Sequence, residues 1–172
     1  MKRTRFTKGI FPIVFSSAVL LTSALGQDID TSKRAIDDFV KQAELKFESS
    51  KVGFVLKTKL KGRTLDEKFS YSMKGNAVEV LSVRYRNGDA DHEEEYFFQG
   101  RQLVYSTERQ VLVHGEGPDW SGVYYFKNGI LLDHTTNGHG KSELDSWKPE
   151  VEVPQMSRKR LKQLGVHLKK GR

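Results

Sequence analysis

Residues 94–133 read EEYFFQGRQLVYSTERQVLVHGEGPDWSGVYYFKNGILLD, and this stretch decides the fold. Tyr96-Phe97-Phe98 is followed by Gln99-Gly100, and Tyr124-Tyr125-Phe126 is followed by Asn128-Gly129. Asn-Gly favours a two-residue hairpin turn, because both residues tolerate positive φ angles. The connections are too short for parallel crossovers. The stretch therefore predicts antiparallel strands joined by hairpins.

The same succession of short apolar runs and glycine-containing turns extends toward the N-terminus, where Asn87-Gly88 is a second hairpin signal. Lys57, Lys59 and Lys61 alternate with apolar residues, which indicates a sheet with one solvated face. We expect six to eight antiparallel strands in a meander. The apolar runs that support them lie at residues 52–60, 69–73, 78–85, 96–98, 103–105, 111–113, 123–126 and 130–132.

The sequence before the sheet predicts a helix. Thr31 or Ser32 is a candidate N-cap, and Ser49-Ser50 is a plausible end. Apolar residues recur between them at helical spacing, and Phe39 lies centrally among them, so we expect Phe39 to be buried against the sheet. The repeating residues are Ile36, Phe39, Val40, Ala43 and Phe47.

After Thr135 the strand pattern fades, and residues 137–140 read as a loop. Residues 150–154 are compatible with a short edge strand. Residues 157–164 predict a short basic helix that ends at Gly165. The fold class is therefore α+β, with an N-terminal helix packed on the meander sheet and a short basic C-terminal helix.

The first 26 residues have the features of a secretion signal. Four basic residues precede an apolar run at residues 10–21, which is too short and interrupted for a membrane span. Ala24 and Gly26 occupy the positions that a signal peptidase reads, so we expect cleavage before Gln27 and a periplasmic or extracellular protein. We divide the chain into a signal peptide at 1–26, an α+β domain at 27–155 and a basic tail or helix at 156–172.

Charge is distributed unevenly along the chain. The formal net charge is +7, but four of the 29 basic residues precede residue 27 and all 22 acidic residues follow it, which leaves +3. Residues 156–172 contain seven basic residues and no acid. A basic segment binds anionic membrane surfaces or polysaccharides, or it is simply a solvated terminus. An exported protein is not expected to bind nucleic acid. The candidate contact residues are Arg158, Lys159, Arg160 and Lys162.

Motifs for catalysis are missing from the sequence. There is no Gly-x-Ser-x-Gly elbow, P-loop or dinucleotide-binding glycine pattern, and no cysteine for thiol chemistry or thiolate metal sites. Asp133, His134 and His139 are a poor ligand set for zinc, which His92 or His114 could complete only from adjacent strands. The acidic run at residues 89–95 lacks the EF-hand order, and we interpret it as a solvated turn that leads into an edge strand. We therefore expect no enzymatic activity, metal or cofactor.

Aromatic residues gather in the second half of the predicted sheet. Adjacent aromatics on a strand face opposite sides, so some lie on an open face that binds ligand, or a helix, a loop or sheet curvature covers them. Trp120 falls in a predicted loop and is the best candidate for an exposed anchor. The candidate ligand-binding residues are Trp120, Tyr96, Tyr124 and Tyr105.

The Tyr-Tyr-Phe-x-x-Gly-x-Leu hairpin at residues 124–131, with its variant at 96–103, resembles small secreted bacterial proteins of uncharacterised function. The resemblance covers residues 94–133, implies an antiparallel sheet and transfers no catalytic residues. The order of helix and meander is also distantly similar to that of periplasmic lipoprotein carriers, whose half-barrels are longer and more apolar.

The leading hypothesis is an exported, non-enzymatic protein that binds an envelope protein, a glycan or an apolar molecule. A carrier of a lipid or other apolar ligand is the alternative, and a large apolar cavity would favour it. A hydrolase with a dispersed site is the third option. It requires convergent carboxylates or histidines with perturbed pKa values in a cleft.

Overall fold

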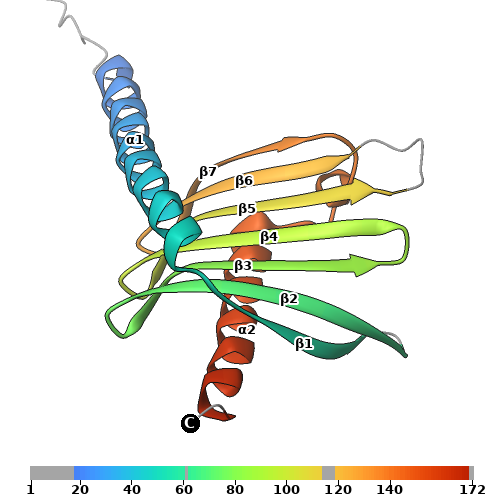
Figure 1. Ribbon diagram of the computed structural model, residues 1–172. Helices are drawn as coiled ribbons and strands as arrows, with labels where there is room; N and C mark the ends of the chain where they lie inside the picture. The colour runs from blue at the N-terminus through green and yellow to red at the C-terminus, as the bar shows by residue number, and fades with distance from the viewer. Residues whose placement is uncertain (1–17, 61, 114–118, 171–172) are drawn as a thin grey trace, which may run out of the picture.

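The computed structural model describes residues 18–60, 62–113 and 119–170, with the side chains of the first helix described from Asp28 onward. Helix α1 (Ala18–Ser50) precedes a sheet of seven strands, and helix α2 (Pro149–Lys170) follows a short 3₁₀ helix, η1 (Lys141–Glu143) (Figure 1). The strands are β1 (Val52–Leu60), β2 (Arg63–Lys74), β3 (Ala77–Asn87), β4 (Ala90–Gln99), β5 (Gln102–Leu112), β6 (Trp120–Lys127) and β7 (Ile130–Asn137).

The sheet is a simple antiparallel meander. Its spatial order, β1-β2-β3-β4-β5-β6-β7, is the order of the sequence. Asn128 and Gly129 have φ angles of 54° and 79°, as the predicted hairpin turn requires. The second predicted hairpin also forms, but its two-residue turn is Gly88-Asp89, because Asn87 ends β3 and pairs with Ala90, and Gly88 has a φ of 63°. The expectation of six to eight antiparallel strands is confirmed. The apolar run at 103–105 and residues 111–112 of the run at 111–113 belong to one strand, β5.

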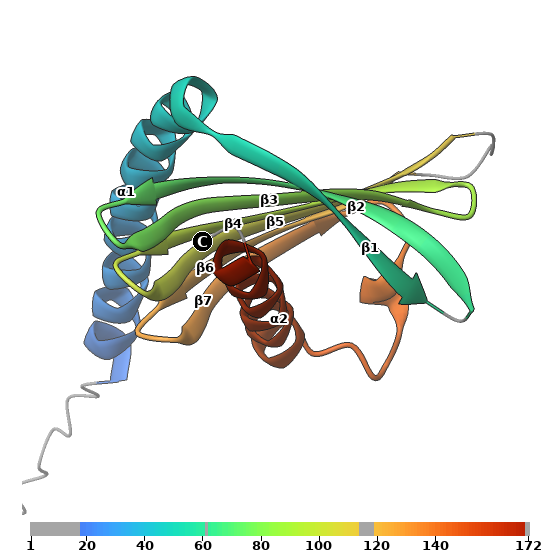
Figure 2. The same cartoon turned by 60° about the horizontal axis from the view of Figure 1, so that its bottom comes forward.

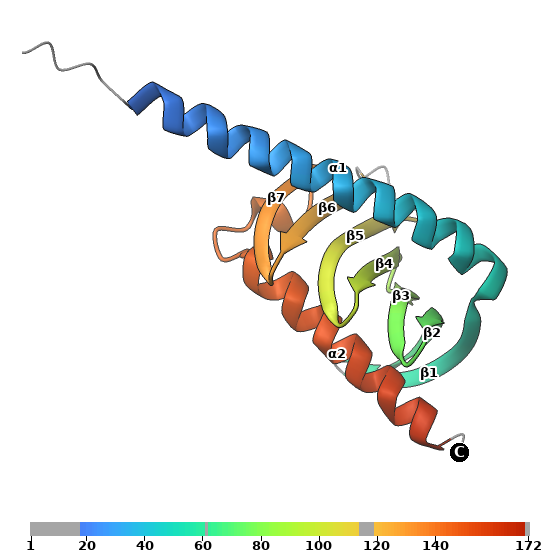
Figure 3. The ribbon, with the colours of Figure 1, turned by 90° about the vertical axis from the view of Figure 1, so that its left-hand side faces the viewer.

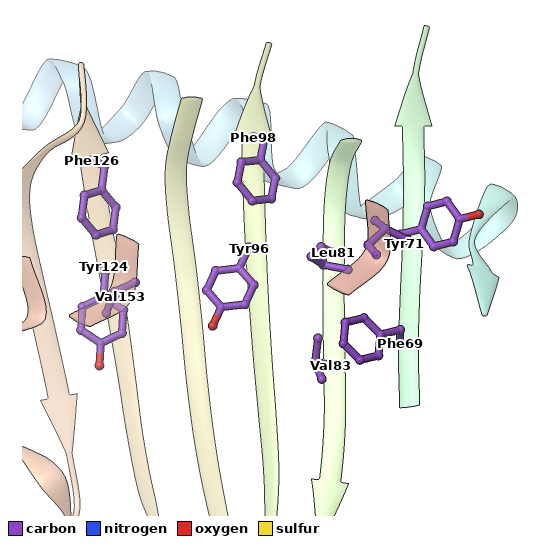
Figure 4. Close-up of a cluster of buried hydrophobic side chains, with 10 residues drawn as sticks. Phe69, Tyr71, Leu81, Val83, Tyr96, Phe98, Tyr124, Phe126 and Val153 are labelled. Carbon is purple, nitrogen blue, oxygen red and sulfur yellow. The ribbon is translucent and has the colours of Figure 1, made fainter. Parts of the chain in front are cut away.

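The two helices cover opposite faces of the sheet, which lies between them in Figure 3. Helix α1 packs across the strand ends near the β4–β5 and β6–β7 turns, and its buried residues contact Val80, Phe97 and Val104. Helix α2 packs on the other face, where the sheet curves around it (Figure 2). Tyr96, Phe98, Tyr124 and Phe126 lie on that face (Figure 4). Both faces are covered where the aromatic runs lie, which explains why consecutive aromatic residues are buried.

The predicted apolar stripe of the first helix is confirmed in α1, but the predicted first residue of that helix is wrong. Residues 18–50 form one helix, so Thr31 and Ser32 are not N-caps. The Ser32 hydroxyl instead donates to the carbonyl of Asp28 within the helix, at 2.7 Å. The predicted cleavage position before Gln27 lies inside α1. Phe39 is only half-buried, because Ile36, Val40, Ala43 and Phe47 form the centre of the contact.

Helix α2 replaces both the predicted edge strand at 150–154 and the short helix at 157–164. It passes through Pro154, which lies in its second turn and cannot donate a hydrogen bond to the carbonyl of Glu150, and through Gly165, around which there is open space. Burial explains its length, because Val153, Ser157, Arg160 and Leu164 recur at helical spacing against the sheet. The segment after residue 155 is therefore not a solvated terminus, and the 155/156 boundary falls within α2.

Candidate functional site

The aromatic residues predicted to bind ligand are not on an open surface. Trp120 opens β6, is 4% exposed, and its indole nitrogen donates to the Ser142 hydroxyl at 3.0 Å. Tyr96 and Tyr124 are fully buried on the α2 face, and Tyr105 is half-buried beside Phe97 on the α1 face. The predicted loop and exposed anchor at Trp120 are thus wrong. The alternative, that a helix covers the aromatic face, is confirmed.

Arg160, predicted to contact an anionic surface, lies instead in the protein interior. Arg160 is 2% exposed because it lies on the side of α2 that faces the sheet. Its Nε and Nη2 donate to the two carboxylate oxygens of Glu94 at 2.7 and 2.9 Å, and its Nη1 donates to Glu67 at 2.7 Å. One guanidinium therefore joins α2 to strands β2 and β4, and it cannot contact a surface.

Four donors hold the Glu94 carboxylate. Besides the two nitrogens of Arg160, the hydroxyls of Tyr96 and Tyr85 donate to it at 3.0 and 3.1 Å. Burial alone would raise the pKa of Glu94, but Arg160 and the two tyrosines outweigh burial and lower it below its ordinary value. Glu94 is therefore a fixed, ionised group.

Glu108 lies directly opposite Glu94 on β5, since the two residues are register partners. It forms an ion pair with Lys141 of η1, and the Tyr124 hydroxyl donates to it at 3.2 Å. Burial raises the pKa of Glu108, and the nearby Glu94 adds to the rise, while Lys141 opposes it. The two neighbouring carboxyl groups thus have pKa values displaced in opposite directions.

A cavity of about 200 Å³ lies beside this pair, between the sheet and η1. Lys141 borders it, with its ammonium 5.1 Å from the centre of the Trp120 ring. His92 stacks on Tyr85 at 4.8 Å, and burial lowers the His92 pKa. The residues that line the cavity include Tyr85, His92, Glu94, Glu108, Gln110, Trp120, Lys141 and Met156.

Acidic residues outnumber basic ones around this site. Glu67, Glu94 and Glu108 are buried and interact with two cations, Arg160 and Lys141, which leaves one excess carboxylate when all five groups are ionised. Burying an uncompensated charge is unfavourable, so the site favours an additional proton or cation. We call this group of five residues the charged cluster.

The acidic run at 89–95 does not lead into an edge strand, because β4 is the central strand of the sheet. Its side chains alternate between the two faces of the sheet, so Glu93 and Asp91 lie on the face opposite Glu94. There Arg84 pairs with Glu93, and Arg86 donates to Asp91 through two bonds of 2.7 and 2.8 Å. These pairs border an exposed, charged groove of about 520 Å³.

The remaining predicted contact residues, Arg158, Lys159 and Lys162, are exposed on the outer side of α2. Among the described residues, no three histidine or acidic side chains are placed to hold a metal ion. Within the same residues, no helix is both long and apolar enough to span a membrane.

The sequence analysis missed Glu67, Glu94, Glu108 and Lys141. A signal for two of them is present: Glu67 alternates in phase with Leu65 and Phe69, and Glu94 is in phase with Tyr96. An acid at a core-facing position of a strand must have a partner.

Comparison with protein-family models, curated proteins and solved structures found no match.

Proposed function

We propose that this chain is an exported, non-enzymatic binding protein whose ligand is a small molecule with an ammonium group. The proposed site is the cavity beside Glu108. The observation that carries the proposal is the burial of Glu108 beside Glu94 at this cavity, where three buried carboxylates face two cations among the described residues. The raised pKa of Glu108 agrees with it.

Lys141 supports this ligand class because it already makes the contacts that such a ligand would make. Its ammonium pairs with Glu108 and lies over the face of Trp120, where a cation is attracted to the ring. Lys141 comes from η1 and is one-third exposed, whereas the Glu108 side chain is 9% exposed. A ligand ammonium that displaces Lys141 would gain both contacts and release the lysine to solvent.

The test compares butylammonium with its anionic analogue, butyrate, by isothermal titration calorimetry. Lys141→Gln vacates the site, so we expect butylammonium to bind this variant about tenfold more tightly than the parent, since a hydrogen bond to a charged group is regained. Lys148→Gln, which removes an exposed lysine outside the cavity lining, should bind like the parent. Equal binding of butyrate, or no gain in Lys141→Gln, would refute the ligand class.

Export rests on residues 1–26 and is part of the proposal. The α1 residues that pack on the sheet, from Ile36 to Phe47, lie after Gln27, so cleavage there is compatible with the helix–sheet contact. Mass analysis of the N-terminus of protein isolated from its host tests this. A chain that retains residues 1–26 would argue against release by a signal peptidase.

A hydrolase is the second candidate, because Glu94 and Glu108 are adjacent carboxyl groups with oppositely displaced pKa values. Against it, both oxygens of Glu94 are already occupied by Arg160 and two tyrosines. Turnover of chromogenic glycosides or esters that is lost in Glu108→Gln would favour it. The carrier hypothesis has weaker support, since it calls for a large apolar cavity and the space between α2 and the β4–β5 and β6–β7 turns measures only about 230 Å³.

A further inference from the structure

The outward side of α2 carries a basic surface that is separate from the cavity. Arg158, Lys159, Lys162, Lys169 and Lys170 are all exposed, and at 100° per residue they fall within an arc of roughly 120°. Val166, 49% exposed, lies within the same arc. We call these five basic residues and Val166 the outer face of α2.

The charge of this outer face is not neutralised within the domain. The last acidic residue of α2 is Glu152, and none of the five basic residues forms an ion pair with another described residue. Arginines on the exposed sheet face behave differently, since Arg84 and Arg86 are both paired with acids. A row of uncompensated cations on one rigid helix is complementary to an anionic surface.

A cavity at the edge of this face indicates which anionic surface it fits. Arg158 and Arg101 border a space of about 230 Å³ between α2 and the β4–β5 and β6–β7 turns. Its lining combines the apolar side chains of Phe98, Leu103, Phe126 and Leu161 with the polar residues Gln102, Asn128 and Ser157. Guanidinium groups bind phosphate through paired hydrogen bonds, and the apolar lining suits hydrocarbon. This combination matches an anionic lipid better than a polysaccharide.

We propose that the outer face of α2 docks the domain on an anionic lipid bilayer. The basic side chains contact headgroup phosphates, Val166 faces the interfacial region, and Arg101 with Arg158 holds one phosphate at the mouth of the 230 Å³ cavity. This site shares no residue with the charged cluster, so an experiment that refutes the ammonium site does not refute lipid docking.

Co-sedimentation of the full chain with vesicles tests the proposal. Vesicles of phosphatidylcholine are compared with vesicles that also contain phosphatidylglycerol, at low and high salt. We expect salt-sensitive binding that requires phosphatidylglycerol. The apolar run at residues 10–21 is present in every variant, so only differences between variants and between lipids are interpreted.

Two matched variants locate the contact. Replacing Lys159, Lys162, Lys169 and Lys170 with glutamine should weaken binding at least about tenfold. A control that replaces Lys46, Lys57, Lys59 and Lys68, four exposed lysines elsewhere, removes the same charge and should bind within about threefold of the parent. Circular dichroism verifies that both variants fold. Equal weakening in the two variants would overturn the proposal, because net charge alone would then explain binding.

The cavity is tested with Arg101→Gln combined with Arg158→Gln. The expected result is weaker binding to phosphatidylglycerol vesicles than a variant with Lys57→Gln and Lys59→Gln shows. Unchanged binding would remove the cavity from the proposal.

Retention on heparin without any binding to anionic vesicles would overturn lipid docking and indicate a glycan partner.

Discussion

The two faces of the sheet hold their helices by different chemistry. On one face, Val40, Ala43 and Phe47 of α1 pack on Val80 and Phe97, and its ionic contacts lie at the rim. On the other, the centre of the α2 contact contains a guanidinium and the carboxylates it binds. One meander thus supports an apolar contact that depends on shape and a mixed contact, in which Val153 and Leu164 of α2 accompany an ion network that depends on pairing.

The difference matters because the two contacts fail in different ways. Loss of apolar volume leaves a cavity, and the destabilisation depends on how far the neighbours relax. Loss of one member of a buried ion pair leaves its partner charged and desolvated, and relaxation of apolar neighbours cannot restore its hydration. Substitutions should therefore distinguish the two faces by magnitude, by pH dependence and by salt dependence.

The largest effect is expected from Arg160→Met, which retains side-chain length but leaves Glu94 and Glu67 without their cation. We expect the free energy of unfolding to fall by ~3–5 kcal/mol, as for other broken buried ion pairs. Urea denaturation measures it. Arg158→Met, on the exposed side of the same helix, should change stability by no more than about 0.5 kcal/mol.

Removing the charges together should recover part of this loss. The variant with Arg160→Met, Glu67→Gln and Glu94→Gln has no unpaired buried charge, so it should be more stable than Arg160→Met alone. If Arg160→Met is as stable as Arg158→Met, the α2 contact does not depend on the ion network and the contrast between the faces fails.

On the apolar face, Phe47→Ala should reduce the free energy of unfolding by about 3 kcal/mol, the lower end for a buried phenylalanine, because the residue lies in the last turn of α1. Leu45→Ala is the matched control, since Leu45 is 71% exposed, and it should change stability little. Phe39 is half-buried, so Phe39→Ala should be less destabilising than Phe47→Ala. The opposite order would mean that α1 is rotated from the position described.

The same contrast explains what the sequence could predict. The α1 stripe and the hairpin turns are local patterns, read from residues a few positions apart, and they were predicted correctly. Arg160 was assigned to a surface because its partners, Glu94 and Glu67, are 66 and 93 residues away. The ends of α2 were wrong for a related reason: Pro154 and Gly165 are local helix breakers, and burial against the sheet outweighs them.

Within the charged cluster, Glu94 and Glu108 should contribute to stability in different pH ranges. The pKa of Glu94 is lowered, so its contribution to stability is present above its ordinary value of 4.5 and is lost as pH falls through the folded-state pKa. The pKa of Glu108 is raised, so its contribution is present below 4.5 and is lost as pH rises through the folded-state pKa.

Urea denaturation of Glu94→Gln and Glu108→Gln across this pH range measures the difference. Relative to the parent, Glu94→Gln should be most destabilised near pH 7, and the deficit should shrink toward about pH 3. Glu108→Gln should improve relative to the parent as pH rises. Parallel pH profiles for the two variants would mean that the pKa values of Glu94 and Glu108 are not displaced in opposite directions.

The smallest effect is expected at the rim of the α1 contact, where Lys33 pairs with Asp133 of β7 and lies 4.9 Å from the centre of the Tyr125 ring. The two charged side chains are 29% and 40% exposed, so solvent screens their attraction, although the hydrogen bond to Asp133 raises the pKa of Lys33. Lys33→Met should therefore lower the free energy of unfolding by only about 0.2–1 kcal/mol.

Salt distinguishes this rim pair from the buried pair of Arg160. At about 1 M salt, exposed charges a few ångströms apart are strongly screened, so Lys33→Met should lose most of its small effect, whereas Arg160→Met should retain its large one. Lys41→Met removes an exposed lysine from the same helix and serves as the control, because Lys41 forms no ion pair with another described residue. A salt-independent loss in Lys33→Met that matches Arg160→Met in size would show that both helices are held by buried charge, and that the two faces are chemically alike.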